Sequence, residues 1–290
     1  RVSSRNKNKL KFLGLEIQNL KMKRILFPFF AFFILFSCKK AEVVEQEKTV
    51  DTVNVPVVEK ETPVEMPADE ADFKNDFDIL RATSYRTWEN ENPATSLTKN
   101  WADLYEKNGR FYLGKADFKI ENGYDECAGD STRIINSATK TLLFIDLPEL
   151  KSGEIKSLKM DRNKIWPNEK ITLTFNGTEY VLRGEGEVLA SEKVINDDGK
   201  EELFQNVKNY KLYISTKNTP EKLLLQEASF NDTFVELLFA GDIDRDGKLD
   251  FIFGANRDYE EERVILFLSS KAESGSNVKK VAEIAIQFDC

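Results

Sequence analysis

The sequence predicts a mainly β protein, either all-β or α+β, with antiparallel sheets in a sandwich or open-barrel-like arrangement and one short N-terminal helix. Two segments, "RFYLGKADFKI" and "ITLTFNGTEYVLRG", alternate with a period of two, which is typical of half-buried strands. The second contains Asn176-Gly177, a strong signal of a type I′ hairpin turn. Many further short apolar segments are separated by turn residues, and this favours a β-dominated domain.

The helix is expected over Ser96–Lys107, "SLTKNWADLYEK". Four apolar residues in this segment recur at helical spacing: Leu97, Trp101, Leu104 and Tyr105. Ser96 would cap the start of the helix, and Asn108-Gly109 would end it. Trp101 and Tyr105 could form a platform for a ligand, but we interpret this face as part of the core.

Strands are expected in the two period-two segments and in a series of later apolar stretches: 187–195, 208–216, 222–230, 233–241, 249–255, 263–270 and 281–288. No internal repeat is found.

The charge is distributed unevenly along the 290 residues. The formal net charge is −8, but residues 1–37 hold eight Lys and Arg against the single acid Glu16, so this segment carries +7 and the rest −15. An acidic body repels a phosphate backbone, and we therefore predict no nucleic-acid partner. The chain has no histidine, which excludes Ser-His-Asp and Cys-His catalysis and HExxH zinc sites.

The segment "MKRILFPFFAFFILFSCKK", which starts at Met22, has the organisation of an export signal. Lys23 and Arg24 precede a twelve-residue apolar run that is too short to span a bilayer, which needs roughly 20 residues. The run ends in Leu35-Phe36-Ser37-Cys38, which resembles the lipobox of bacterial lipoproteins. That resemblance implies a signal peptide over 22–37 and acylation of Cys38, so that residues 1–21 would precede the true start. An ordinary cleaved signal or an uncleaved anchor is the alternative.

The lipoprotein resemblance also implies a location. Such a protein is tethered to a membrane of the cell envelope outside the cytoplasm, and we expect the outer membrane. Residues 38–71 have no aromatic residue and alternate valine with glutamate, so they cannot bury enough surface to fold and are predicted to form a disordered acidic tether. A β-rich domain is then expected over 72–290.

Cys127 and Cys290 are the only cysteines after Cys38. In an oxidising compartment two such thiols more often pair than stay free, and this predicts a disulfide between them. Two separate thiols remain the alternative, because the geometry of a pair cannot be deduced from sequence.

The segment "GDIDRDGKLDFIFGAN" concentrates four carboxylates in nine positions, at Asp242, Asp244, Asp246 and Asp250. Calcium prefers six to eight oxygen ligands, and alternate residues of a tight loop can direct carboxylates at one centre. Gly247 permits the sharp turn, and Lys248 would offer its backbone carbonyl. The sequence therefore predicts a Ca²⁺ loop over 242–250, with a solvated acidic turn as the alternative.

This loop is not an EF-hand, because its twelfth position holds Phe253 rather than a bidentate glutamate. Its flanks are predicted strands, and the stretch resembles the calcium loop of FG-GAP or VCBS-type repeats. The resemblance implies that all four aspartates bind calcium between two strands. Since the propellers of that family need several copies and this chain has one, a propeller is not expected. We expect a weak structural site, with a dissociation constant on the order of 10⁻⁴–10⁻³ M.

Two functions are compatible with these features. The first is a lipid-anchored, non-enzymatic envelope protein whose calcium-stabilised β domain binds a protein or glycan ligand or acts as a scaffold. The alternative is an envelope hydrolase that attacks polysaccharide or peptidoglycan with paired carboxylates, for which Asp125, Glu126 and Asp130 are candidates. The segment "YDECAGDS" also fits a simple turn around Cys127, so no catalytic residue is assigned.

Overall fold

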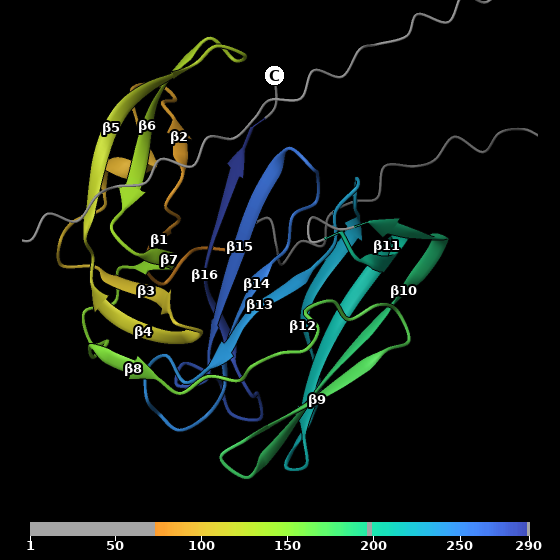
Figure 1. Cartoon of the computed structure of the whole chain (residues 1–290). Helices are drawn as coiled ribbons and strands as arrows, with labels where there is room; N and C mark the ends of the chain where they lie inside the picture. The colour runs from red at the N-terminus through yellow and green to blue at the C-terminus, as the bar shows by residue number, and fades with distance from the viewer. Residues whose placement is uncertain (1–72, 196–198, 289–290) are drawn as a thin grey trace, which may run out of the picture. The chain divides into compact units, whose positions relative to one another are not determined.

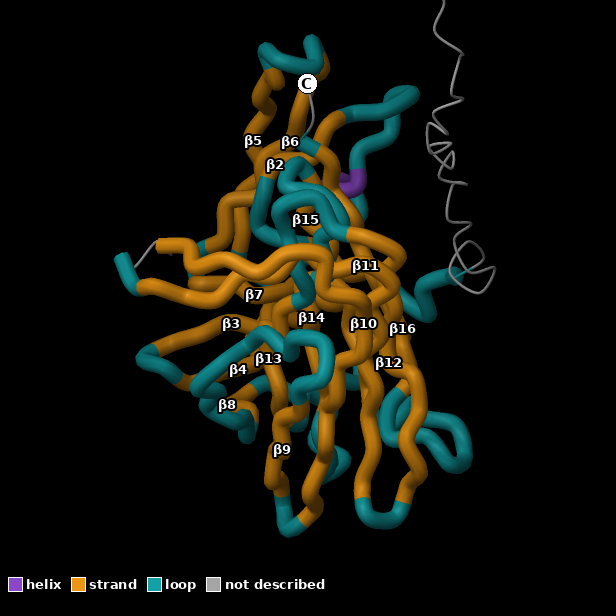
Figure 2. Tube along the Cα trace, turned by 90° about the vertical axis from the view of Figure 1, so that its right-hand side faces the viewer, coloured by secondary structure: helices purple, strands orange, loops and turns teal. Residues whose placement is uncertain are grey.

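The structure, a computed structural model, describes residues 73–195 and 199–288. The predicted upstream extension, signal peptide, Cys38 and tether lie outside the described residues, as does Cys290. The described part consists of strands joined by loops, with a single short 3₁₀ turn, η1 (Pro93–Thr95) (Figure 2). No helix in this part of the chain is long and apolar enough to cross a membrane.

Sixteen strands are present in the described residues. In chain order they are β1 (Ile79–Leu80), β2 (Ser84–Arg86), β3 (Ala102–Lys107), β4 (Arg110–Lys115), β5 (Phe118–Asp125), β6 (Asp130–Ser137), β7 (Lys140–Ile145), β8 (Gly153–Ile155), β9 (Lys170–Phe175), β10 (Thr178–Ile195), β11 (Glu201–Thr216), β12 (Thr219–Ser229), β13 (Glu236–Gly241), β14 (Asp250–Gly254), β15 (Glu261–Leu268) and β16 (Lys279–Gln287).

These strands form four sheets, with the strand orders β1-β7-β3-β4-β8, β12-β11-β10-β9, β13-β14-β15-β16 and β2-β6-β5. Neighbouring strands are antiparallel throughout these sheets. The prediction of a mainly β fold with antiparallel sheets is therefore confirmed.

The sheet β13-β14-β15-β16 lies between the sheets β12-β11-β10-β9 and β1-β7-β3-β4-β8 (Figure 1). Phe251 and Phe253 of β14 pack into the core shared with β10 and β11, whereas Ile252 between them packs against β3 and β7. Side chains that alternate along a strand point to opposite faces of the sheet. Both faces of this sheet are covered, which explains why "FIF" and "VILFL" are continuous apolar runs.

The predicted hairpin at Asn176-Gly177 is confirmed. Phe175 of β9 pairs with Thr178 of β10, and the two turn residues have φ values of +48° and +80°. Both values lie in the left-handed region that a type I′ turn requires. Asparagine and glycine tolerate this region better than other residues.

The predicted helix over Ser96–Lys107 is wrong. The chain instead makes the 3₁₀ turn η1 and then enters strand β3, in which Leu104 pairs with Leu113 of β4 and Leu143 of β7. Asn108 and Gly109 have φ values of +52° and +73° and form the β3–β4 hairpin turn instead of ending a helix. Pairing with two neighbouring strands outweighs a helical spacing of apolar residues, because pairing buries the same side chains.

The prediction that Trp101 belongs to the core is confirmed, since only 3% of the residue is exposed. It packs with Leu80, Tyr85 and Phe144 in a third core region, between the sheets β2-β6-β5 and β1-β7-β3-β4-β8. The segment "RFYLGKADFKI", predicted as continuous strand, is divided at Ala116-Asp117. Its two halves, β4 and β5, belong to different sheets.

Candidate metal site

The acidic loop connects β13, which ends at Gly241, to β14, which begins at Asp250. The segment after β8 runs antiparallel to the free edge of β13. The Asp242 amide donates to the Lys156 carbonyl at 2.9 Å, and Ser157 forms a bridge with Gly241. A Cβ atom on Gly241 would lie 2.8 Å from the Lys156 carbonyl oxygen, so the close approach of the two backbones requires glycine there. This contact fixes where the loop starts.

The aspartates of the loop bind the backbone of the loop itself. Asp242 Oδ2 accepts from the Gly247 amide at 3.1 Å, and Asp246 Oδ1 accepts from the Lys248 amide at 2.8 Å. Arg245 and Gly247 have φ values of +66° and +88°, which bend the chain into a tight turn. Short acidic side chains thus fold the loop, as they do in Asx turns.

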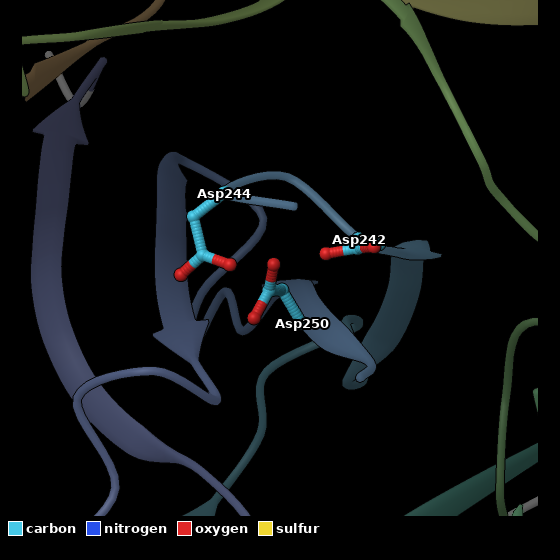
Figure 3. A group of neighbouring side chains, drawn as sticks. All are labelled: Asp242, Asp244 and Asp250. Atoms are coloured by element: carbon cyan, nitrogen blue, oxygen red, sulfur yellow. The ribbon is translucent and has the colours of Figure 1, made fainter. Parts of the chain in front are cut away.

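Three of the four carboxylates converge. One oxygen from each of Asp242, Asp244 and Asp250 lies within 4.8 Å of the other two, and Figure 3 shows the three carboxylates pointing toward one another. Carboxylate oxygens at this separation can surround a single cation. The loop and the first residue of β14 therefore bring together an acidic triad that can hold a metal ion.

Asp250 is completely buried. Its Oδ1 accepts from the Ser269 amide at 2.7 Å and from the Ser269 hydroxyl at 2.8 Å, and its Oδ2 accepts from the Ile243 amide at 2.7 Å. Burial raises the pKa of this carboxyl to about 8, and the negative charge of Asp244 adds to the increase. A cation beside Asp250 would favour its charged form.

Asp242 Oδ1 is a buried oxygen without a hydrogen-bond partner in the described part of the chain. Burial raises the pKa of Asp242, and the charges of Asp246 and Asp244 raise it further. A buried, unpaired carboxylate oxygen costs about 1–3 kcal/mol or more. A divalent cation would satisfy this oxygen, so the donor set fits an oxygen-preferring ion such as calcium.

Asp246 is not part of the triad. Its Oδ1 accepts from the Ser269 hydroxyl at 3.0 Å as well as from the Lys248 amide, and the Lys248 ammonium lies 3.8 Å from its Oδ2. The backbone carbonyl of Lys248 remains a predicted ligand.

Two serines that we did not predict belong to the site. Ser269 bonds both Asp246 and Asp250, and the hydroxyl of Ser270 donates to Asp244. They follow β15, which pairs with β14, so the sheet register brings them to the loop. Their sequence signal is only two polar residues after an apolar run.

The loop also contacts two neighbouring sheets. The Asn176 side-chain amide donates to the Gly247 carbonyl at 2.7 Å, and the Leu249 amide approaches the Tyr180 hydroxyl at 3.4 Å. On the other side, the Arg245 guanidinium donates to the Ser152 carbonyl at 3.0 Å, just before β8. A cation that orders this loop would therefore also order contacts between sheets.

The other predicted sites lie at the β5–β6 turn. Asp125 Oδ1 accepts from the amides of Cys127 and Ala128, and its Oδ2 is paired with Arg86 at 2.8 Å. The side-chain hydrogen bond from Arg86 is the main reason that the pKa of Asp125 is lowered. These contacts are those of a simple turn. They favour the turn over a catalytic role as the interpretation of Asp125.

Cys127 lies in this same turn, whereas its predicted partner Cys290 lies outside the described residues. Their pairing therefore stays a prediction.

Comparisons with protein-family models, with curated proteins and with solved structures found no match for this chain.

Proposed function

We propose that this protein is a lipid-anchored protein of the cell envelope whose β-rich domain is stabilised by Ca²⁺ bound at the loop 242–250. It binds a ligand or acts as a scaffold and does not catalyse a reaction. The observation that carries the calcium site is the convergence of Asp242, Asp244 and Asp250 within 4.8 Å, together with the unpartnered buried oxygen of Asp242. Three carboxylates in this arrangement repel one another unless a cation neutralises them.

The anchor is supported by the sequence of residues 22–38. The ligand-binding or scaffolding role is supported by Asp125, a candidate catalytic acid whose carboxylate is engaged in the contacts of a turn. A disulfide between Cys127 and Cys290 belongs to the same proposal. Its support is that Cys127 and Cys290 are the only cysteines after Cys38, which the anchor would acylate. Such a bond would tie the end of the chain to the β5–β6 turn.

Thermal unfolding of the full chain tests the calcium site. With a dissociation constant on the order of 10⁻⁴–10⁻³ M, calcium at about 10 mM should stabilise the folded state by roughly 1.4–2.7 kcal/mol relative to EGTA. For a domain of this size, the corresponding rise in melting temperature is about 3–10 °C. Magnesium, which demands a tighter octahedral site, should produce a smaller rise.

Two variants make this test specific. Asp244→Asn should remove most of the calcium-dependent rise, because it deletes one charge from the triad. The matched control is Asp161→Asn, which changes an exposed acid outside the loop and should leave the rise intact. Melting curves of the wild type in calcium and in EGTA that superimpose would reject the calcium site.

A further inference from the structure

Trp88 is the most exposed large apolar side chain in the described part of the protein, with 75% of the residue accessible. The other two tryptophans, Trp101 and Trp166, are buried in the core, with 3% and 6% exposed. A single exposed apolar residue is ordinary on a protein surface. The backbone and the pocket around Trp88 are what distinguish it.

A strained two-residue turn presents Trp88. The backbones of Trp88 and Glu91 exchange hydrogen bonds of 2.8 and 2.7 Å, and the residues between them, Glu89 and Asn90, have φ values of +49° and +69°. Glutamate is disfavoured in this left-handed region, where glycine is the usual residue. Such strain persists where the surrounding structure enforces it, and it concentrates at sites that hold ligands.

The base of this turn is held firmly. The Thr87 amide donates to the Ser131 carbonyl of β6 at 2.9 Å. The buried side-chain amide of Asn92 donates to the Tyr85 carbonyl at 2.8 Å and to the Thr87 hydroxyl at 3.1 Å. Trp88 is therefore part of a rigid support, which limits the entropy lost when a ligand binds.

Trp88 lines an open pocket of about 710 Å³ beside β2 and β16. Asp78, Asn90 and Glu91 also line it, and their side chains make no hydrogen bond or ion pair with any residue that the structure describes. The volume lies within the range of small-ligand sites, about 300–1,000 Å³. The pocket thus combines one exposed aromatic face with several polar groups available to a ligand.

We propose that this pocket binds a saccharide, with a pyranose ring stacked on Trp88 and its hydroxyl groups bonded to Asp78, Asn90 and Glu91. One face of a pyranose presents C–H hydrogens of slight positive charge, and the electron-rich face of an indole attracts them. Sugar hydroxyls both donate and accept hydrogen bonds, so they match carboxylate acceptors and an amide that does both. The inference rests on the ligand-binding role proposed above and is independent of the calcium loop.

A protein partner fits this surface less well. The cores of protein interfaces are apolar and depleted of charge, whereas the charged residues Asp78 and Glu91 line the same pocket as Trp88. A second copy of the chain is the alternative occupant that the experiment must distinguish.

Tryptophan fluorescence of the full chain gives a direct test, because only Trp88 is exposed to a quencher. Acrylamide quenching is measured with cellotriose, maltotriose, mannotriose, xylotriose and chitotriose up to about 10 mM, each with calcium and with EGTA. At least one trisaccharide should protect Trp88 from acrylamide, and isothermal titration calorimetry should give a saturable binding curve for it. If none protects Trp88, the proposal is wrong, whatever the calcium melts show.

Variants complete the test. Trp88→Ala should weaken binding at least tenfold by calorimetry with an unchanged melting temperature, and Trp88→Phe should retain part of the affinity. The matched control Tyr259→Ala removes another aromatic residue, 61% exposed, that does not line the pocket, and it should bind as the wild type does. Equal affinity of Trp88→Ala and the wild type would overturn the proposal, as would protection of Trp88 that depends on protein concentration and needs no sugar.

Discussion

Asp103 illustrates the cost of burying a carboxyl group. Only 1% of the residue is exposed, and its Oδ2 accepts from the Thr139 hydroxyl at 2.7 Å. Its Oδ1 is buried and has no hydrogen-bond partner in the described residues. Burial raises the pKa of Asp103 more than the hydroxyls of Thr139 and Thr141 lower it. The charged form is therefore less stable in the folded protein than in the unfolded chain.

The sign of the pH dependence follows from this shift. A pKa that is higher in the folded state gives a stabilising contribution that is complete below the pKa of the unfolded chain, about 3.9, and is lost as pH rises through the folded pKa. Asp103→Asn keeps an acceptor for Thr139 and removes the charge. At pH 7 it should raise the free energy of unfolding by about 1 kcal/mol, and this gain should vanish near pH 3.

Urea unfolding at the two pH values measures this difference. The control Asp146→Asn changes an exposed acid and should shift stability by less than about 0.5 kcal/mol. A loss of stability in Asp103→Asn at pH 7 would contradict the prediction.

At the level of elements, glycine lets backbones approach where a loop crosses a strand. The segment between β8 and β9 passes over Gly184 of β10. A Cβ atom on Gly184 would lie 2.7 Å from the Trp166 carbonyl oxygen and 2.8 Å from that of Ile165. The Gly184 amide also donates to the Glu169 carbonyl at 3.0 Å. This crossing places Trp166 against Phe234, with ring centroids 4.1 Å apart.

Gly184→Ala should therefore lower the free energy of unfolding by about 1–3 kcal/mol, because the clash is with backbone atoms that cannot move independently. The matched variant Gly114→Ala, in β4, places a Cβ 3.2 Å from the side chain of Tyr105, which can move aside. Chemical denaturation of both variants provides the comparison. Equal destabilisation would show that the crossing over Gly184 can relax.

On the scale of the whole molecule, the central sheet β13-β14-β15-β16 shares one core with β9 to β12 and another with β3, β4, β7 and β8. The acidic loop lies at one end of that sheet and touches both flanking sheets through Asn176 and Arg245. The proposed calcium ion would then stabilise the assembly of sheets as well as the loop. The proposed anchor connects this β-rich domain to a membrane through Cys38.

The anchor gives the prediction at this scale. Cys38→Ala should release the protein from the membrane fraction of cells, because stable anchoring needs more than one acyl chain and each buried CH₂ contributes about 0.8 kcal/mol. Ser37→Ala keeps a small residue before the predicted cleavage point and should leave the protein in the membrane fraction. The location of both variants is measured by cell fractionation with immunoblotting. The mature N-terminus of each is determined by mass spectrometry. An unmodified mature protein that begins upstream of Cys38 would refute the anchor.

Two Asn-Gly pairs of the chain, Asn108-Gly109 and Asn176-Gly177, show that a turn can be predicted from sequence when the conformation of the residues before it cannot. The same dipeptide forms a hairpin turn at both places, but the helical spacing of apolar residues before Asn108 suggested a helix end. An Asn-Gly pair indicates only that the chain turns there or that a helix ends there. Whether the preceding residues form a helix or a strand depends on which distant segments pair with them.

Three features could be predicted from residues close together in the chain: the mainly β architecture, the hairpin at Asn176-Gly177, and the spacing that lets Asp242, Asp244 and Asp250 meet. The reason is that alternation and turn chemistry act over a few neighbouring residues. Three features became visible only in the folded structure: Ala102–Lys107 is a strand, Ser269 binds the acidic loop, and Trp88 lines a pocket together with Asp78 and Glu91. These features depend on burial and on pairing between residues far apart in the chain. Contacts of this kind cannot be predicted from local composition.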